Sequence, residues 1–205
     1  LRIVLERARE RRVREPEVEE PAEEVHHLGD AAIPEDGLDR VAEPAPRALE
    51  LLGVAEPEAR AQAEKRWADW LACYADDVDF FMPSWDDDDK LTTDPKNEVS
   101  LIYYPSKAGL EDRVFRIETE RSSASTPDTR YNRSISNIEI LAQDESRVDL
   151  TFQFTTHSFR YEILDTYFGT CRYEMDTSGP KPLIKKKYIV LKNDYIHHML
   201  DVYHV

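Results

Sequence analysis

The segment VDLTFQF, residues 148–154, alternates strictly between apolar and polar side chains, and it constrains the fold more than any other feature. Successive side chains of a β-strand point to opposite faces, so the alternation predicts a strand with one face in a core and the other facing water. Three isoleucines between residues 135 and 140 begin this sheet-like pattern. The second half of the chain is therefore predicted to form a sheet.

Long antiparallel strands are expected to continue to the end of the chain. Residues 159–173 carry on the strand pattern, with Gly169 predicted as a bulge that helps to curl the sheet. Residues 183–192 and 195–205 flank Asn193–Asp194, a two-residue connection whose side chains tolerate positive φ. We predict a hairpin formed by these last two segments.

The part before residue 135 has helical signals between short strands. Residues 76–83 and 99–104 are predicted strands, and residues 110–121 are predicted to form a helix. Two apolar stripes recur at helical spacing, one made of Trp67, Trp70, Leu71 and Tyr74 and the other of Leu110, Val114, Phe115 and Ile117. Along the chain, the predicted helices come first and most of the predicted strands come last. This order predicts an α+β domain with N-terminal helices packed on a curved antiparallel sheet.

Charge and composition exclude several classes of partner. The net charge is -15 and the pI is near 4.8, whereas a phosphate backbone or an anionic membrane calls for clustered Lys and Arg. No apolar run reaches the length of about 18 residues that spans a membrane, and residues 1–20 are too charged for a signal peptide, so a cytoplasmic protein is expected. Cys73 and Cys171 are expected to be buried thiols.

Residues 1–57 differ in amino-acid composition from the rest of the chain. Up to residue 64 there is no Phe, Tyr, Trp, Ser, Thr, Asn, Lys, Met or Cys, so this part can build little core. One hypothesis is a disordered or loosely helical extension. The other is GC-rich DNA translated in a shifted frame, which Ser, Thr and aromatic codons in the alternative frame would support. Residues 58–205 are expected to be the folded domain.

Four adjacent aspartates, Asp86, Asp87, Asp88 and Asp89, follow Trp85. A Ca²⁺ loop spaces its carboxylates with intervening residues and a glycine, which this run lacks. The residues are interpreted as a solvated turn, helix-capping residues or subunit contacts, with an ion or a partner arginine as the alternative.

A series of motifs in fixed order resembles a known family. The segments are WDDDD at 85–89, TTDP at 92–95, SLIYYP at 100–105, GLEDRVFRIETERSSA at 109–124 and PDTR at 127–130. They resemble the small (β) subunit of the aromatic-ring-hydroxylating dioxygenases, in the branch that acts on benzoate, toluate or anthranilate. The resemblance extends from about Glu58 to Val205.

The resemblance implies a cystatin-like cone of the type shared with nuclear transport factor 2, and a subunit without catalytic, metal or cofactor residues of its own. The Rieske [2Fe-2S] cluster and the mononuclear Fe(II) are expected in a large (α) subunit, in an α3β3 hexamer with a β trimer that an NADH-dependent reductase supplies with electrons. The implied role is structural, within an enzyme that cis-dihydroxylates benzoate or a related aromatic carboxylate. The candidate subunit contacts are Trp85, Asp86, Asp87, Asp88, Asp89, Tyr103, Tyr104, Glu111, Arg113, Arg116, Glu120, Arg121, Arg130, Tyr203 and His204.

The residues themselves also speak against oxygenase chemistry in this chain. Neither cysteine has the neighbouring histidine that a Rieske centre requires, and His197, His198 and His204 lie on the predicted last strand, His198 and His204 on one face. An alternative hypothesis is that a chain with this fold acts alone as an isomerase or dehydratase. In that case Asp79, Tyr103 and His157 would supply an acid and a base inside an apolar pocket. A scaffolding protein for an unrelated partner is a third reading.

Overall fold

The computed structural model describes residues 57–119, 121 and 127–205. The expectation for residues 1–57 therefore lies outside the described residues, apart from Pro57. None of the described helices is long and apolar enough to cross a membrane.

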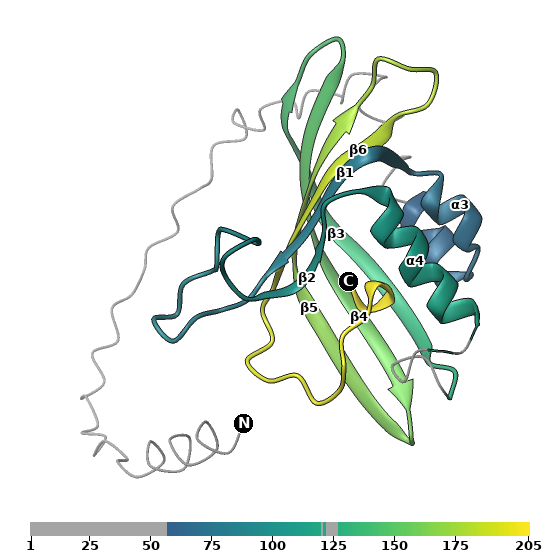
Figure 1. Ribbon diagram of the computed structural model, residues 1–205, viewed down its shortest axis with the longest axis vertical. Coiled ribbons are helices and arrows are strands. Elements are labelled where there is room, and N and C mark those ends of the chain that lie inside the picture. The colour runs from purple at the N-terminus through teal and green to yellow at the C-terminus, as the bar shows by residue number, and fades with distance from the viewer. Residues whose placement is uncertain (1–56, 120, 122–126) are drawn as a thin grey trace, which may run out of the picture. The chain divides into compact units, whose positions relative to one another are not determined.

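A short first helix covers residues 57–63. The following elements, labelled in Figure 1, are α3 (Trp67–Leu71), β1 (Tyr74–Pro83), β2 (Ser100–Tyr104), α4 (Lys107–Glu118), β3 (Arg130–Gln143), β4 (Arg147–Arg160), β5 (Ile163–Asp176), β6 (Leu183–Leu191) and the 3-10 turn η1 (Val202–His204).

The described strands form one six-stranded sheet in the order β2-β1-β6-β5-β4-β3. The pairs β1–β2, β3–β4, β4–β5 and β5–β6 are antiparallel, as expected. The pair β1–β6 is parallel, so the expectation of a wholly antiparallel sheet is wrong at this position. The reason is topological: β2 and β3 are the two edges, and α4 carries the chain from one edge to the other.

The helices and the final turn η1 cover one face of the sheet, as Figure 1 shows. Apolar side chains alternate along β4 as the sequence predicts, because Leu150, Phe152 and Phe154 are all buried under this layer. Leu110 and Val114 of α4 pack into the same core. The predicted α+β class, with helices on one face of a sheet, is confirmed.

Each of the two predicted apolar stripes contains one residue that the structure places differently. Tyr74 does not belong to the helix of Trp67 and Trp70, because α3 ends at Leu71 and Tyr74 begins β1. Its ring nevertheless packs edge-on to Trp70, with centroids 4.9 Å apart, so its burial was predicted correctly. Phe115 of α4 was expected in the core, but 53% of it is exposed.

The predicted strand 159–173 is interrupted near its start. Tyr161 and Glu162 form a tight turn between β4 and β5, both with φ in the left-handed region, at 53° and 62°. This turn contains no glycine or asparagine, the residues that usually mark a two-residue turn in a sequence, so the turn was not predicted. Gly169 is not a bulge, because β4–β5 pairing is regular there; in β5–β6 the register shifts at Glu174–Met175.

Gly169 is needed for a different reason. A Cβ atom at this position would collide with the main-chain carbonyl of Val190 on β6. The glycine therefore allows the close approach of two strands.

The predicted strand at residues 195–205 is absent from the structure. After β6 the chain forms an irregular segment that Asn193 fixes, because its side chain accepts a hydrogen bond from the main-chain N–H of Phe168 and donates one to the carbonyl of Thr166. The chain then folds over the sheet as η1, capped by Asp201. Since the segment crosses the core face, His198 and His204 do not share a strand face.

Candidate functional site

A buried carboxylate lies in the interior, where the first helix meets the sheet. Glu58 is completely buried. Its Oε1 accepts hydrogen bonds from Trp70 Nε1 at 2.7 Å, from the Tyr74 hydroxyl at 2.7 Å and from Lys187 Nζ at 3.0 Å. Its Oε2 accepts one from the Tyr173 hydroxyl at 3.1 Å. Every donor comes from a different element than Glu58, so the carboxylate ties the helix to α3, β1, β5 and β6.

A second buried cation completes this cluster. Arg133 of β3 places Nη1 3.4 Å from Glu58 Oε2, and the same nitrogen donates to Gln62 Oε1 at 3.0 Å and to the main-chain oxygen of Val205 at 3.1 Å. Lys187 Nζ lies 3.4 Å from that oxygen. The cluster therefore also holds the segment that ends in η1 against the sheet.

The electrostatics of the cluster keep Glu58 ionised. Burial alone would raise the pKa of Glu58, but the charges of Lys187 and Arg133 and the hydrogen bonds of Tyr74 and Trp70 outweigh it and lower the pKa from 4.5 to about 2. Burial lowers the pKa of Lys187, and Glu58 opposes that effect. A carboxylate that is charged at every physiological pH and sealed from water is a structural anion, not a general acid or base.

The interior therefore does not suit the isomerase reading. That chemistry needs an open apolar pocket with a titratable group. Here the space around Glu58 is filled by completely buried side chains, among them Trp70, Tyr74, Phe80, Leu110, Phe152 and Tyr173.

The structure also keeps the proposed acid and base out of the interior. By strand alternation Asp79, Tyr103 and His157 belong to the face of the sheet turned away from the helices. Asp79 pairs with Lys186 at 3.9 Å, and His157 is exposed with its Nδ1 3.1 Å from Thr166 Oγ1. These three residues do not form an acid and base pair in a cone.

The four aspartates form an exposed turn, as predicted. Trp85 and Leu91 bridge its base, and Asp86 Oδ1 accepts hydrogen bonds from the main-chain N–H groups of Asp88 and Lys90 at 2.9 and 2.8 Å. The Trp85 indole N–H donates to the carbonyl of Leu191 at 2.8 Å, yet 45% of the residue is exposed. Asp86 thus shapes the turn, whereas the carboxylates of Asp87 and Asp88 face water.

Helix α4 divides the predicted contact residues into two groups. Glu111 and Arg116 are exposed, and Arg116 pairs with Asp112 one turn earlier at 2.5 Å. Arg113 instead turns inward, where Nε donates to Asp201 Oδ1 at 2.7 Å and Nη2 pairs with Oδ2 of the same carboxylate. Arg113, one of the candidate subunit contacts, therefore anchors the C-terminal segment to α4 within its own chain.

The remaining contact candidates near α4 are more scattered. Arg121 is exposed and lies over the ring of Phe115, with 5.8 Å to its centroid, and Glu120 lies outside the described residues. Tyr104 is half-buried, with its ring against Gly109 of α4. Tyr103 packs against Phe81 on the opposite face, with centroids 5.8 Å apart.

Tyr203 and His204 are enclosed by their own chain, with 2% and 4% of each exposed. Tyr203 stacks on Tyr131, with centroids 5.1 Å apart, and His204 Nδ1 accepts a hydrogen bond from the Asp201 N–H at 3.0 Å. Burial lowers the pKa of His204 from 6.5 to about 3, so its imidazole is neutral. These two candidates are thus placed where they brace the fold from inside.

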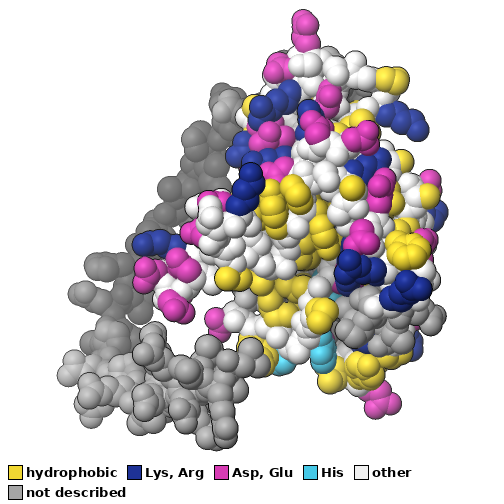
Figure 2. Space-filling view, in the orientation of Figure 1, with side chains coloured by type: hydrophobic (Ala, Val, Ile, Leu, Met, Phe, Trp, Pro, Cys, Tyr) yellow, Lys and Arg dark blue, Asp and Glu magenta, His cyan; other side chains and the backbone are white. Residues whose placement is uncertain are grey.

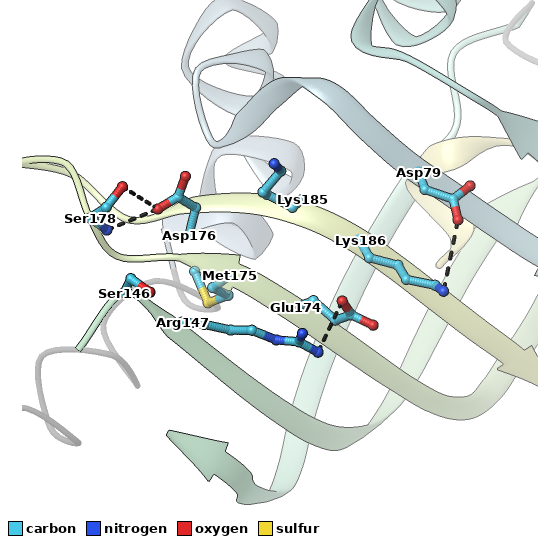
Figure 3. A pocket seen from close by; sticks show the side chains of 9 residues that line it. All are labelled: Asp79, Ser146, Arg147, Glu174, Met175, Asp176, Ser178, Lys185 and Lys186. Carbon is cyan, nitrogen blue, oxygen red and sulfur yellow. Dashed lines mark hydrogen bonds and ion pairs between the residues drawn. The ribbon is translucent and has the colours of Figure 1, made fainter. Parts of the chain in front are cut away.

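A cleft of about 560 Å³ opens beside the ends of β4, β5 and β6 (Figure 3). Its charges are already paired: Arg147 lies 3.2 Å from Glu174, and Lys186 lies 3.9 Å from Asp79. Positive and negative groups that neutralise one another offer no preference for a charged ligand. The cleft is consistent with a solvated sheet face.

The two cysteines are free thiols; Cys171 is buried as expected, whereas Cys73 is only half-buried. Burial raises the pKa of Cys171 to about 12 and that of Cys73 to about 11, which opposes the thiolate form that binds iron. In the part of the chain that the structure describes, no three His, Cys, Asp or Glu side chains gather as a metal site would need. This donor set does not fit a Rieske centre or a mononuclear iron.

Sequence reasoning missed an apolar surface at the far end of β4 and β5. Phe159, Leu164 and Phe168 are 38%, 62% and 44% exposed, and Tyr161 at the turn is 61% exposed. Arg130 lies over the ring of Phe159, with 5.5 Å to its centroid. Alternation along residues 159–168 was visible in the sequence, but the unrecognised turn hid which side chains share a face.

Comparison with known proteins supports the resemblance found in the motifs. The family model described as "Ring hydroxylating beta subunit" matches residues 57–198. The benzoate 1,2-dioxygenase subunit beta of Acinetobacter baylyi is 53% identical over 148 residues, which are 72% of this chain and 88% of that protein. The toluate 1,2-dioxygenase subunit beta of Pseudomonas putida is 52% identical over 148 residues, 72% of this chain and 91% of the relative.

A solved structure agrees with the sequence comparison. The crystal structure of the beta subunit of the benzoate 1,2-dioxygenase from Burkholderia mallei superposes with a TM-score of 0.65 at 45% identity, covering 77% of this chain and 96% of that one. The cone-type fold that the motifs implied is therefore confirmed. The matched regions contain both the aspartate turn and the buried Glu58 cluster.

Proposed function

Since this chain belongs to the family of ring-hydroxylating dioxygenase β subunits, we propose that it is the small, non-catalytic subunit of a terminal oxygenase that cis-dihydroxylates benzoate or a related aromatic carboxylate. The observation that carries the proposal is the identity of 53% to a benzoate 1,2-dioxygenase β subunit over 88% of that protein. The toluate relative is 52% identical, so the ring substituent is left open.

The interior supports a structural role for the chain. Glu58 is ionised, buried and surrounded by five donors from five elements, α3, β1, β3, β5 and β6. Two of these donors, Arg133 and Lys187, also hold the C-terminal segment through the carbonyl of Val205. Such a cluster rigidifies a domain and leaves no room for a substrate. A rigid body with a filled core is what a bracing subunit requires.

The oxygenase chemistry belongs, in this proposal, to a large (α) subunit that carries a Rieske [2Fe-2S] cluster and a mononuclear Fe(II). Those centres would supply electrons and activate O2, and an NADH-dependent reductase would deliver the electrons. The assembly is proposed to be an α3β3 hexamer in the cytoplasm. In it the β chains form a trimer that supports the α subunits.

Exposed residues on the surface are the proposed contacts with other subunits. They are Trp85, the aspartates of the turn that follows it, Glu111, Arg116, Arg121 and Arg130. Arginine pairs well with carboxylates across interfaces, and exposed Trp is a frequent anchor.

The proposal is tested by co-expressing the chain with the α subunit of a benzoate 1,2-dioxygenase. We expect an equimolar complex that contains iron and acid-labile sulfide and consumes O2 and NADH with benzoate once reductase is added. The chain purified alone should contain neither iron nor sulfide. Failure to form any complex, together with isomerase or dehydratase turnover by the isolated chain, would overturn the proposal in favour of the stand-alone enzyme.

A further inference from the structure

Lys187 and Arg133 bring two positive charges into the interior, whereas Glu58 brings one negative charge. Both cations are sealed from water, since 0% of the Lys187 side chain and 1% of the Arg133 side chain are exposed. Among the described residues, no other carboxylate lies within ion-pair distance of either cation. Tyr74 and Tyr173 are neutral, because burial raises the pKa of each hydroxyl well above its ordinary value of 10.0. The described side chains therefore leave the cluster with one positive charge in excess.

A buried charge without a counter-charge is rare in proteins, because its removal from water is far more costly than that of a neutral polar group. Charges at the surface avoid this cost. On the face that Figure 2 shows, basic and acidic side chains are interspersed at the surface. The interior cluster has no such surroundings, so its excess positive charge requires a negative group nearby.

Both cations converge on the main-chain oxygen of Val205. This oxygen accepts a hydrogen bond from Arg133 Nη1 at 3.1 Å and lies 3.4 Å from Lys187 Nζ. Gln62 Nε2 lies 3.4 Å from the same oxygen, and Val205 is completely buried. A carbonyl oxygen thus occupies the position at which a negatively charged oxygen would neutralise the cluster.

The remaining donors of Arg133 are a second, independent observation. Its Nε and Nη2 atoms are buried without a hydrogen bond of good geometry among the described residues, although the Tyr173 hydroxyl lies near. The guanidinium lies over the rings of Phe152 and Phe154, 5.9 and 5.8 Å from their centroids. Buried polar groups are normally hydrogen-bonded. Arg133 therefore has the capacity for a further acceptor, which a carboxylate supplies because it has two oxygens where a carbonyl has one.

The residues before Val205 fix its position beside the two cations. Asp201 caps η1 and pairs with Arg113 of α4, and Tyr203 stacks on Tyr131 of β3. Figure 1 shows η1 over β4, on the side of the sheet that α4 covers. The oxygen is therefore held in place by neighbouring contacts, which lowers the entropic cost of an ion pair at this position.

We propose that the Glu58 cluster is an internal carboxylate site, completed by a second carboxylate at the position of the Val205 carbonyl. Two sources supply the same chemistry. One is the main-chain carboxylate of a chain that ends at Val205, and the other is a small carboxylate from solution in a chain that continues. In either case Arg133 and Lys187 face two carboxylates, and the four charges cancel.

The group that follows the Val205 main chain can be changed without altering any side chain. A chain that ends at Val205 with a carboxylate is compared with the same chain ending in a carboxamide, made by enzymatic amidation of a glycine-extended precursor. The amide has nearly the shape of the carboxylate but no charge. In differential scanning calorimetry at pH 7, we expect the amide to lower the melting temperature by about 5 °C or more, because it leaves a buried cation unpaired.

Removing one cation tests whether this effect arises in the cluster. In a Lys187→Met chain Glu58 already balances Arg133, so amidation should lower the melting temperature by less than about 1 °C. Lys186→Met is the matched control, because Lys186 is the next residue of β6 and its side chain is 40% exposed. This control should retain the full effect of amidation. Arg133→Met takes the place of Lys187→Met if the latter does not fold.

A chain extended by Gly-Ser-Gly after Val205 separates the two sources of carboxylate. In NaCl it should melt as low as the amidated chain. If sodium formate at equal ionic strength restores its melting temperature, the site takes a carboxylate from solution; if not, the main-chain carboxylate is the source.

The proposal is overturned if either the amidated or the extended chain is as stable in NaCl as the chain that ends in a carboxylate. It is also overturned if amidation is as destabilising in the Lys187→Met chain as in the wild-type chain. None of these measurements involves the α subunit, so their outcome is independent of the proposed function.

Discussion

Replacing Glu58 by glutamine removes one negative charge from the buried cluster and changes the shape of the side chain very little. Lys187 and Arg133 then remain buried without the carboxylate that both face. Breaking a buried ion pair in this way typically costs about 3–5 kcal/mol. The depression of the Glu58 pKa from 4.5 to about 2 gives a similar value of about 3 kcal/mol. We expect Glu58→Gln to lower the free energy of unfolding at pH 7 by about 3 kcal/mol.

The pH dependence of this loss has a definite sign. The pKa of Glu58 is lower in the folded state than its ordinary value of 4.5, so its contribution is complete above pH 4.5 and disappears as the pH falls towards 2. The difference between the wild-type chain and Glu58→Gln should therefore be largest at neutral pH and should shrink between pH 4.5 and 2. Urea unfolding at equal protein concentration, repeated across this range, measures it.

Two further variants separate charge from general disturbance. Glu111→Gln on the exposed side of α4 is the matched control and should change stability by less than about 0.5 kcal/mol. Adding Lys187→Met to Glu58→Gln should recover part of the loss, because the unpaired cation is replaced by an apolar side chain of similar length. The reasoning is wrong if Glu58→Gln is as stable as the wild-type chain at pH 7, or if the difference does not shrink in acid.

Three other outcomes are expected from the structure. Gly169→Ala should cost about 2 kcal/mol or more in urea unfolding because its Cβ would collide with the carbonyl of Val190, whereas Gly179→Ala, which has room, should cost less than about 0.5 kcal/mol. Glu162→Gly should raise the unfolding free energy of the monomer by about 0.5–1 kcal/mol, because glycine adopts the left-handed turn without strain; lower thermal stability would contradict this. Burial lowers the pKa of His204 from 6.5 to about 3, so the chain should lose stability as the pH falls through this window, and His204→Gln should lose less; equal slopes would refute the assignment.

Much of the fold was predictable because its strongest signals are local. Alternation in residues 148–154 depends only on which face of a strand is buried, and β4 follows it. The aspartate turn after Trp85 was equally clear, since the run offers its own hydrogen-bond acceptors to the main chain. Family motifs added the identity of the fold, which periodicity alone could not provide.

The errors arose where distant parts of the chain decide the conformation. Residues 195–205 alternate like a strand. In the structure, however, Arg113 binds Asp201 and Arg133 of the Glu58 cluster binds the carbonyl of Val205, so the segment crosses the core face instead. Nothing within one segment signals that Glu58, Arg133 and Lys187 will meet, because they come from a helix and two non-adjacent strands. The turn at Tyr161–Glu162 was not predicted, because residues that usually avoid left-handed φ occupy both of its positions.

The central position of β6 has a consequence for the order in which the protein can fold. β6 lies between β1 and β5, and Tyr74 pairs with Ile184, far along the chain. During synthesis, β1 and β2 can form a hairpin early, but they have no neighbour in the sheet until β6 has left the ribosome. Lys187, the partner of Glu58, arrives on that same strand. The chain should therefore fold slowly for its size. Until β6 is synthesised, β1 and β5 each expose an unpaired strand edge, so the nascent chain is a candidate for chaperone assistance.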